Sequence, residues 1–477
     1  MILLACCMML LAVGCNTTID TESISTAGIT SETSSNVENF IDDDFFEGEE
    51  ALGNDSDSGV SSRTSPIPAA NVVGGKSWAD VFKGMPSSLK GTTLTVYNWN
   101  AISEYTGGAN AIKQFQKSTG INVKWVTENF DTYLSKLASM VASGSSPDLV
   151  RMRSPLPSGS MSVQPISVTG YDYSDDAWDK WIMNSYTANG NVYATSLNNT
   201  LVSSPDMIMY NKALISKYDL DDPYQLWKKG QWTYDNFIKL CKDYKSESGS
   251  DYAGSLYDYS QITSWFGVTG PVAFDGKTYT STLSNSNFIS ATQKMADLRN
   301  KDRLIKAWDS DGFDQGKILL WIGSAVYTRR NNSYFNSLKN AGSIGVVPCP
   351  KIEGQSNYYQ LYSEVEAYGI AKGAKNPQAA PYFLRYFLDG SNYDIDAYFC
   401  NKQAVEVYNY CTQQTNKCWT SLYQEQTQFY NGAKSTDEFN TALDSATGAQ
   451  VLNVINSNAS VVNERVNKYN KQLSELK

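Results

Sequence analysis

Two strand-like stretches of the chain are each followed by side chains that could bind a ligand, an aromatic ring with polar groups in one case and two arginines in the other. In "YNWNAISEYTGG" these are Trp99, Asn100 and Glu104, and in "VRMRSP" they are Arg151 and Arg153. Ligands of open α/β sheets bind beyond the carboxyl ends of the strands, where such groups can converge. Oriented donors and acceptors beside a ring suit a sugar, because its hydroxyls need hydrogen bonds and its C–H face packs on an aromatic surface. Each residue alone is more often structural, but the combination at adjacent strand ends indicates a binding site.

A pair of carboxylates and two aromatic or basic stretches are weaker candidates. Glu364 and Glu366 lie two apart on a predicted strand, which would point both to one face. The pair has three interpretations: the catalytic carboxylates of a glycosidase, hydrogen-bond acceptors for ligand hydroxyls, or the solvated face of an edge strand. The catalytic interpretation has the weakest support of the three. Trp265 lies in the turn-rich "ITSWFGVTGP". Arg329, in "YTRRNNSY", suits a solvated helix start or a guanidinium in a cleft equally well.

Several kinds of catalytic and metal site are absent from the sequence. There is no histidine, which removes Ser-His-Asp and Cys-His catalysis and imidazole-based zinc sites. There is also no G-x-G-x-x-G, Walker A or G-x-S-x-G pattern. We therefore expect no cofactor and no metal. The cysteines beyond Cys15 are odd in number and contain no C-x-x-C pair, so disulfides and buried thiols both stay open; they are Cys241, Cys349, Cys400, Cys411 and Cys418.

The net charge of −10 belongs to one segment. Residues 16–75 contain twelve acidic residues and one basic residue, whereas the rest of the chain holds 38 basic and 37 acidic residues. Segment 16–75 has few large apolar residues, so it is expected to be a disordered tether. The folded body is close to neutral, which argues against a nucleic-acid partner and favours a neutral ligand.

An apolar run precedes this segment. Residues 1–14 have the length of a signal-peptide core and end in small residues before Cys15. The run could instead be a short buried helix. Ala12, Val13 and Gly14 resemble a lipobox, although Ala12 stands where leucine is usual. In that case the chain is cut before Cys15, and the thiol is acylated, for instance with palmitate.

Strand and helix patterns alternate in two parts of the body. β-branched and aromatic residues predict strands at 93–99, 121–126 and 147–152, with helices between them that end at Gly120 and Gly144. The pattern restarts with strand-like 206–210, a helix capped by Thr233, strand-like segments within 316–327 and 343–350, and a terminal helix with an apolar face. The alternation predicts two α/β units with mostly parallel sheets.

These stretches together resemble a known family. "LTVYNWN…AIKQFQKSTGINVKWV", "YLSKLASMVASGSSPDLVRM", "FDQGKILLWIGSAVY" and "YGIAKGAKNPQAAPYFLRYFLDG" are similar to segments of family 1 extracellular solute-binding proteins, the lipoprotein components of bacterial ABC sugar importers. The layout is similar to that of maltodextrin-binding proteins over about residues 90–400. The resemblance implies a two-lobed periplasmic-binding-protein fold of type II, in which each lobe is a mostly parallel sheet flanked by helices and a hinge joins the lobes.

The resemblance also implies a division of the chain. Its crossings between lobes fall near Asn198–Ser204, Leu320–Ser324 and Leu361–Glu366. The expected segments are a signal peptide (1–14), an anchored tether (15–75), lobe 1 (76–200 and 321–361) and lobe 2 (201–320 and 362–477).

By position, the family's ligand contacts match six residues already named and three more. The six are Trp99, Asn100, Glu104, Arg151, Arg153 and Trp265. The three additions are Asn198 or Asn199 at the first crossing, and Tyr327, whose ring together with that of Trp265 is expected to form an aromatic surface for the ligand. The resulting expectation is a receptor on the outer face of the bacterial cytoplasmic membrane that binds a neutral oligosaccharide, acts as a monomer and delivers its ligand to ABC permease subunits. The alternatives are a secreted glycan-cleaving enzyme and a surface glycan adhesin without a transporter.

Overall fold

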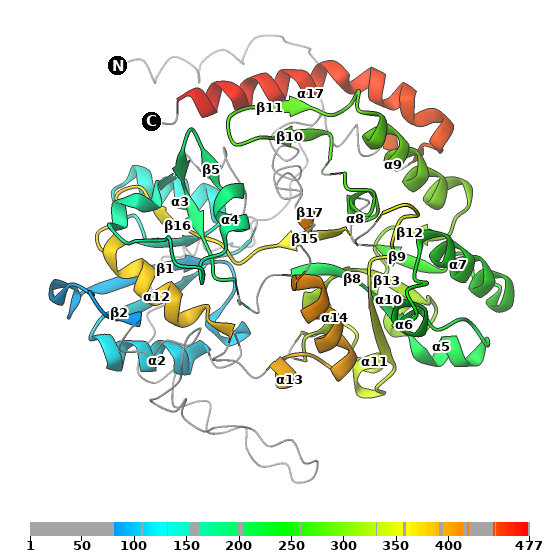
Figure 1. Cartoon of the computed structure of the whole chain (residues 1–477), viewed down its shortest axis with the longest axis horizontal. Helices are drawn as coiled ribbons and strands as arrows, with labels where there is room; N and C mark the ends of the chain where they lie inside the picture. Colours follow the sequence, from blue (N-terminus) through cyan, green and yellow to red (C-terminus); the bar gives the residue numbers. More distant parts are fainter. Residues whose placement is uncertain are drawn as a thin grey trace, which may run out of the picture. The chain divides into compact units, whose positions relative to one another are not determined.

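The structure described here is a computed structural model, and Figure 1 shows its elements. It describes residues 81–105, 108–130, 132–152, 162–198, 200, 204–256, 260–268, 270–330, 332–355, 359–390, 395–413, 417–418, 442–443 and 445–475. The predicted signal run, Cys15 and the acidic tether lie outside these residues. No helix in the described part is long and apolar enough to cross a membrane.

The first sheet has the strand order β2-β1-β3-β16-β4, and β7 also pairs with β16. Strands β1, β2 and β3 are parallel, as predicted, whereas β16 runs antiparallel to β3. The expected mostly parallel sheet is therefore mixed. Its strands are β1 (Thr93–Asn98), β2 (Asn122–Thr127), β3 (Leu149–Arg151), β4 (Val163–Gln164), β7 (Ala194–Thr195) and β16 (Tyr368–Ala371).

Helices cover both faces of this sheet. On one face, Phe115 of α2 packs against Phe383 and Tyr386 of α12, with Leu94 and Val96 of β1 beneath them. On the other face, α3 contributes Tyr133 and Leu137 to a second apolar cluster. The helices are α2 (Gly108–Thr119), α3 (Tyr133–Ala142), α4 (Lys180–Ser185) and α12 (Ala380–Phe387). Gly120 and Gly144 end α2 and α3 with positive φ angles of 71° and 75°, as the sequence predicts.

The second sheet is centred on β8. Its order is β12-β9-β13-β8-β15-β17, and β14 pairs with β8 as well. All eight residues of β8 are buried because its side chains alternate between two apolar clusters: Ile208 and Tyr210 enter one, and Met207 and Met209 enter the other. The strands are β8 (Ser204–Asn211), β9 (Gly254–Leu256), β12 (Ile305–Lys306), β13 (Leu320–Ser324), β14 (Ile344–Pro348), β15 (Gln360–Glu364) and β17 (Lys417–Cys418).

The remaining elements are two hairpins and further helices, and Ala188 and Val192 of the first hairpin pack in the apolar clusters of the first sheet. Thr233 accepts a hydrogen bond from the Asn236 amide and caps α7, as predicted. Two hairpins add β5 (Thr187–Ala188) with β6 (Asn191–Val192), and β10 (Val272–Phe274) with β11 (Tyr279–Ser281). The helices are α5 (Lys212–Lys217), α6 (Pro223–Lys228), α7 (Tyr234–Ser248), α8 (Ser260–Ser264), α9 (Ser286–Ala296), α10 (Ser310–Asp314), α11 (Asn336–Asn340), α13 (Ile395–Tyr398), α14 (Lys402–Gln413) and α17 (Val451–Ser474).

The sheet pairing divides the chain differently from the predicted lobe boundaries. Strand β7 belongs to the first sheet and β8 to the second, and β15 belongs to the second sheet and β16 to the first, so two changes of sheet lie beside the expected crossings near Asn198–Ser204 and Leu361–Glu366. However, β13 and β14 both pair with β8 of the second sheet, so no crossing occurs at 320–324. Strand β16 and helix α12 belong instead with the first sheet. The physical reason is that β13 also pairs in parallel with β9, which leaves it no neighbour in the first sheet.

Cys241, Cys349, Cys400 and Cys411 are free thiols. Cys241, Cys349 and Cys411 have no exposed surface, and Cys400 is half-buried. Burial raises the pKa of each of these thiols above its ordinary value, so they are protonated and unreactive in the folded protein.

Close packing at β8 generates a prediction about stability. A Cβ atom at Gly345 of β14 would lie 2.2 Å from Cζ of Tyr210, whose hydroxyl is held by a 2.6 Å hydrogen bond to Asp222. We expect Gly345→Ala to lower the free energy of unfolding by about 1–3 kcal/mol, because the ring cannot move aside freely. Urea denaturation measures this change. Ser343→Ala is the nearby control, and equal stability of the two variants would contradict the packing argument.

Candidate functional site

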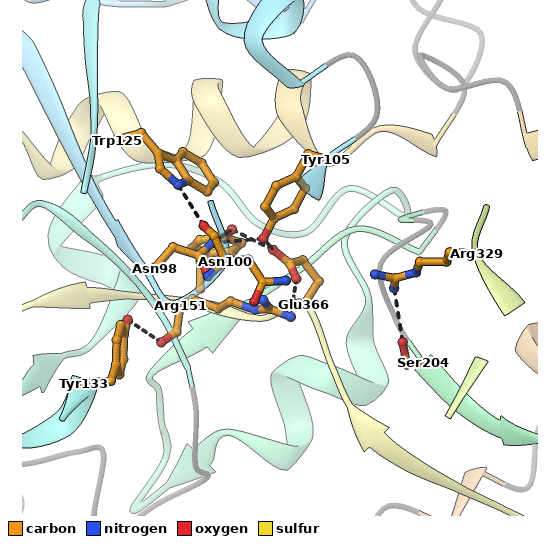
Figure 2. Close-up of polar contacts among 10 residues, drawn as sticks. Asn98, Asn100, Tyr105, Trp125, Tyr133, Arg151, Ser204, Arg329 and Glu366 are labelled. Carbon is orange, nitrogen blue, oxygen red and sulfur yellow. Dashed lines mark hydrogen bonds and ion pairs between the residues drawn. The ribbon is translucent and has the colours of Figure 1, made fainter. Parts of the chain in front are cut away.

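A buried ion pair lies at the carboxyl edge of the first sheet. Arg151 Nη2 is 2.7 Å from Glu366 Oε2, and neither side chain has exposed surface. Arg151 ends β3, and Glu366 lies in the segment that joins β15 to β16. Figure 2 shows the two side chains directed toward each other, with Asn98 of β1 and Tyr105 close by.

Tyrosine hydroxyls and an asparagine complete this network. Glu366 Oε1 accepts hydrogen bonds from the hydroxyls of Tyr105 at 2.7 Å and Tyr368 at 2.6 Å. The Asn98 side-chain amide donates to both hydroxyls at 2.9 Å. Burial is the main cause that raises the pKa of Tyr105 and of Tyr368 well above the ordinary value, so both hydroxyls keep their protons and donate to the carboxylate.

The network supports Trp99. The Arg151 guanidinium carbon lies 4.2 Å from the centroid of the half-buried Trp99 ring, within cation–π distance. Tyr133 and the 41%-exposed Phe130 contact the same ring edge-on, with centroids at 5.1 Å and 5.7 Å. Trp99 is therefore held in one orientation while part of its surface stays accessible.

The loop after Trp99 is fixed through its backbone. The Asn100 amide donates to Asn98 Oδ1 at 2.9 Å, and its carbonyl accepts the Trp125 indole N–H at 3.0 Å. The exposed Glu104 accepts a 2.8 Å hydrogen bond from the Ala101 amide and so caps the short helix Ile102–Glu104. The predicted trio Trp99, Asn100 and Glu104 is thus brought together at one strand end.

The other predicted residues lie in several different places. Asn198 is exposed, and its side chain donates to the Asp176 carbonyl. Arg329 is buried and donates to Ser204 Oγ at 3.2 Å, a contact that Figure 2 also draws. Trp265 has no exposed surface and packs on Phe237 in the core of the second sheet. Arg153, Asn199 and the Glu364 side chain lie outside the described residues.

Aromatic rings also gather at the carboxyl ends of the parallel strands of the second sheet. Trp308 follows β12, and Tyr327 follows β13. Trp308 and Tyr334 are 41% and 40% exposed, whereas Tyr327 is buried beside them. The Trp308 and Tyr334 centroids are 5.7 Å apart, and Tyr327 lies 5.4 Å from Tyr334 and 6.2 Å from Trp308. We call these three residues the aromatic platform.

Sequence reasoning found only part of these features. The sequence patterns did not identify Trp308 or Tyr334. The signal that could have identified Trp308 is an aromatic residue shortly after a strand. Because β12 has only two residues, its pattern is too short to mark that strand. Sequence reasoning also missed the structural roles of Asn98 and Tyr105. The described residues contain no group of three or more acidic or cysteine side chains that could hold a metal ion.

Sequence comparison decides the family. A profile described as bacterial extracellular solute-binding protein matches residues 110–396. The chain belongs to this family. Membership implies a location outside the cytoplasm, and it places the chain among binding proteins. No curated protein sequence matches the chain.

Solved structures with the same fold include three binding proteins. The GacH receptor of Streptomyces glaucescens, solved unliganded and with acarbose, is 15% identical, with a TM-score of 0.56 over 81% of this chain and 99% of that chain. Maltose-bound MalE3 of T. maritima is 15% identical, with a TM-score of 0.54 over 78% and 100%. The galacto-N-biose-/lacto-N-biose I-binding protein of a Bifidobacterium longum ABC transporter is 15% identical, with a TM-score of 0.55 over 79% and 97%. The solute-binding protein therefore has the two-lobed fold of these receptors.

The ion pair generates a prediction about stability. Glu366→Gln leaves the Arg151 charge buried without its counter-ion, so we expect a loss of about 3–5 kcal/mol in the free energy of unfolding, measured by urea denaturation. The double variant Arg151→Met/Glu366→Gln should recover part of this loss, because it removes the unpaired charge.

A surface pair in the same chain is the control. Lys239 contacts Asp221 and Asp243 with all three side chains substantially exposed. Lys239→Met should therefore cost less than about 1 kcal/mol. A similar effect of Glu366→Gln and Lys239→Met would contradict the structural role of the buried pair.

Proposed function

We propose that this solute-binding protein captures a sugar or oligosaccharide outside the cell and delivers it to the permease of an ABC transporter. The observation that carries the proposal is a tryptophan beyond the carboxyl ends of parallel strands in each sheet, half-buried at Trp99 and 41% exposed at Trp308. Trp99 lies on Arg151, and Trp308 lies edge-on to Trp321 with centroids 4.9 Å apart. Aromatic surfaces fixed by buried partners suit the C–H faces of sugar rings, and neighbouring polar groups suit the hydroxyls.

Charge and the comparisons support the same ligand class. The body beyond residue 75 is nearly neutral in net charge, which fits a neutral ligand better than an ionic one. The three structural relatives described above were solved with acarbose or a homologue, maltose and lacto-N-biose. Binding without chemistry requires only that the ligand favour one conformation of the receptor over another, which a transporter can then recognise.

The buried carboxylate argues against Glu366 as a catalytic acid in the glycosidase alternative. A catalytic acid must reach the glycosidic oxygen of a substrate, whereas Glu366 is fully buried between Arg151 and two tyrosine hydroxyls. Incubation with a labelled oligosaccharide separates the two functions, because a receptor releases no cleavage product.

Binding by the two tryptophans is directly testable. We expect an unbiased glycan screen, followed by calorimetric titration with acarbose, maltose and lacto-N-biose, to find a glycan that binds. Trp99→Ala and Trp308→Ala should each weaken its affinity about tenfold, since an aromatic contact contributes about 0.5–1.5 kcal/mol beyond its buried area. Leu452→Ala is the matched control, because Leu452 is an exposed apolar residue on α17. Unchanged affinity in both tryptophan variants would rule out the proposed contact surface.

We also propose that the receptor is tethered to the membrane through Cys15. Small residues before Cys15 and the acidic stretch 16–75 support a lipoprotein with a long spacer. Radiolabelled palmitate should be incorporated into the wild-type protein but not into Cys15→Ser, and the variant should appear in the soluble fraction. Cys241→Ser controls for loss of a thiol elsewhere. Membrane retention of Cys15→Ser would contradict the anchor.

A further inference from the structure

A lysine of α11 holds the loop that carries two residues of the aromatic platform. The Lys339 ammonium donates 2.8 Å hydrogen bonds to the backbone carbonyls of Arg329 and Asn332. Both carbonyls belong to the connection between β13 and α11, which also contains Tyr327 and Tyr334. A single cation therefore joins two points of one loop to the helix that follows it.

The contacts continue from Asn332 to the exposed ring. Asn332 Oδ1 accepts a 2.9 Å hydrogen bond from the Tyr334 amide. The next residue, Phe335, has a φ of +61°, which a bulky residue rarely adopts without support. Because this strained position directly follows Tyr334, the loop needs an external contact to keep the Tyr334 ring beside Trp308.

The other acceptor of Lys339, the Arg329 carbonyl, belongs to a residue that contacts the start of β8. Arg329 donates through Nη2 to Ser204 Oγ, and Ser204 is the first residue of β8. The same lysine therefore fixes the backbone of the arginine that contacts the start of the central strand. Lys339 is therefore linked to the aromatic platform through Asn332 and to β8 through Arg329.

We propose that Lys339 is a positioning residue that sets the geometry of the aromatic platform and thereby its affinity for glycans. The affinity part of this inference rests on the proposed function. The positioning part rests on the contacts of Lys339 alone. Lys339 touches the loop carbonyls and acts on the ligand only through Tyr334 and its neighbours.

The charge of Lys339 makes this role dependent on pH. Burial lowers its pKa from the ordinary 10.5 to about 8, against the opposing effects of the Cys400 thiol and the Asp314 carboxylate. Asp314 itself accepts hydrogen bonds from Ser337 and Leu338 of α11, and the positive charges of Arg330 and Lys212 act on Cys400. Above pH 8 the folded protein therefore loses the ammonium, and its two charge-assisted hydrogen bonds weaken.

The contribution of Lys339 to stability and the order of the aromatic platform should respond to pH in opposite directions. Between pH 8 and 10.5 the unfolded chain binds more protons at this position than the folded protein does. The contribution of Lys339 to the free energy of unfolding therefore rises with pH across that window. The buried thiols act in the opposite sense, because burial raises their pKa values and the unfolded chain loses those protons first. A loss of loop order is therefore assigned to Lys339 by comparison with Lys339→Arg, which contains the same thiols.

Hydrogen exchange tests the positioning role without any glycan. We expect Lys339→Met to lower the amide protection of residues 325–330 and 332–335 about tenfold at pH 7, and Lys339→Arg to retain it because the charge remains. Wild type should lose protection between pH 7 and pH 9, and Lys339→Arg should not. Lys242→Met, an exposed lysine of α7, is the matched control. Unchanged protection in Lys339→Met overturns the proposal.

Titration with acarbose, maltose and lacto-N-biose tests the consequence for binding. Lys339→Met should weaken the affinity of any of these glycans that binds wild type about tenfold, with Lys339→Arg close to wild type. An unchanged affinity together with a loosened loop overturns the affinity part. If no glycan binds wild type at all, the proposed function fails, and the exchange experiment still decides whether Lys339 positions the platform.

Discussion

The ion pair between Arg151 and Glu366 is the constraint on which the first sheet and its edge depend. Two charges removed from water need hydrogen bonds besides their mutual contact, and here two tyrosine hydroxyls donate to the carboxylate while an asparagine amide donates to those hydroxyls. These partners come from the ends of β1, β3 and β16 and from the segment before α2. One network therefore fixes the register of three strand ends, and Trp99 takes its orientation from the buried guanidinium.

The two aromatic surfaces are supported by different physical means. Trp99 lies on a buried charge, whereas Trp308 lies on other rings and on a loop held through its carbonyls. In both cases the tryptophan ring contacts a fully buried side chain, which is Arg151 for Trp99 and Trp321 for Trp308. Such preorganisation lowers the entropic cost of binding, because the receptor does not have to order its own side chains when a ligand arrives.

Local signals in the sequence predicted much of the fold, and long-range pairing was beyond them. Strands such as β1 and β8, the stop at Gly120 and the cap at Thr233 depend on neighbouring residues, so their patterns are visible in a short window. The assignment of β13 and β16 to sheets depends on partners far along the chain, which an apolar run does not specify. For the same reason Glu366 could be recognised as unusual but not as the partner of Arg151.

The unpaired, deeply buried cysteines have a consequence for the life of the protein before it folds. A protein that acts outside the cytoplasm acquires its structure in surroundings that oxidise thiols. Cys241, Cys349 and Cys411 are shielded once they are enclosed, since burial keeps each sulfur in its unreactive protonated form. During export the same sulfurs are accessible. Enclosure of these thiols in the apolar clusters beside β8 during folding therefore ends their exposure to oxidation.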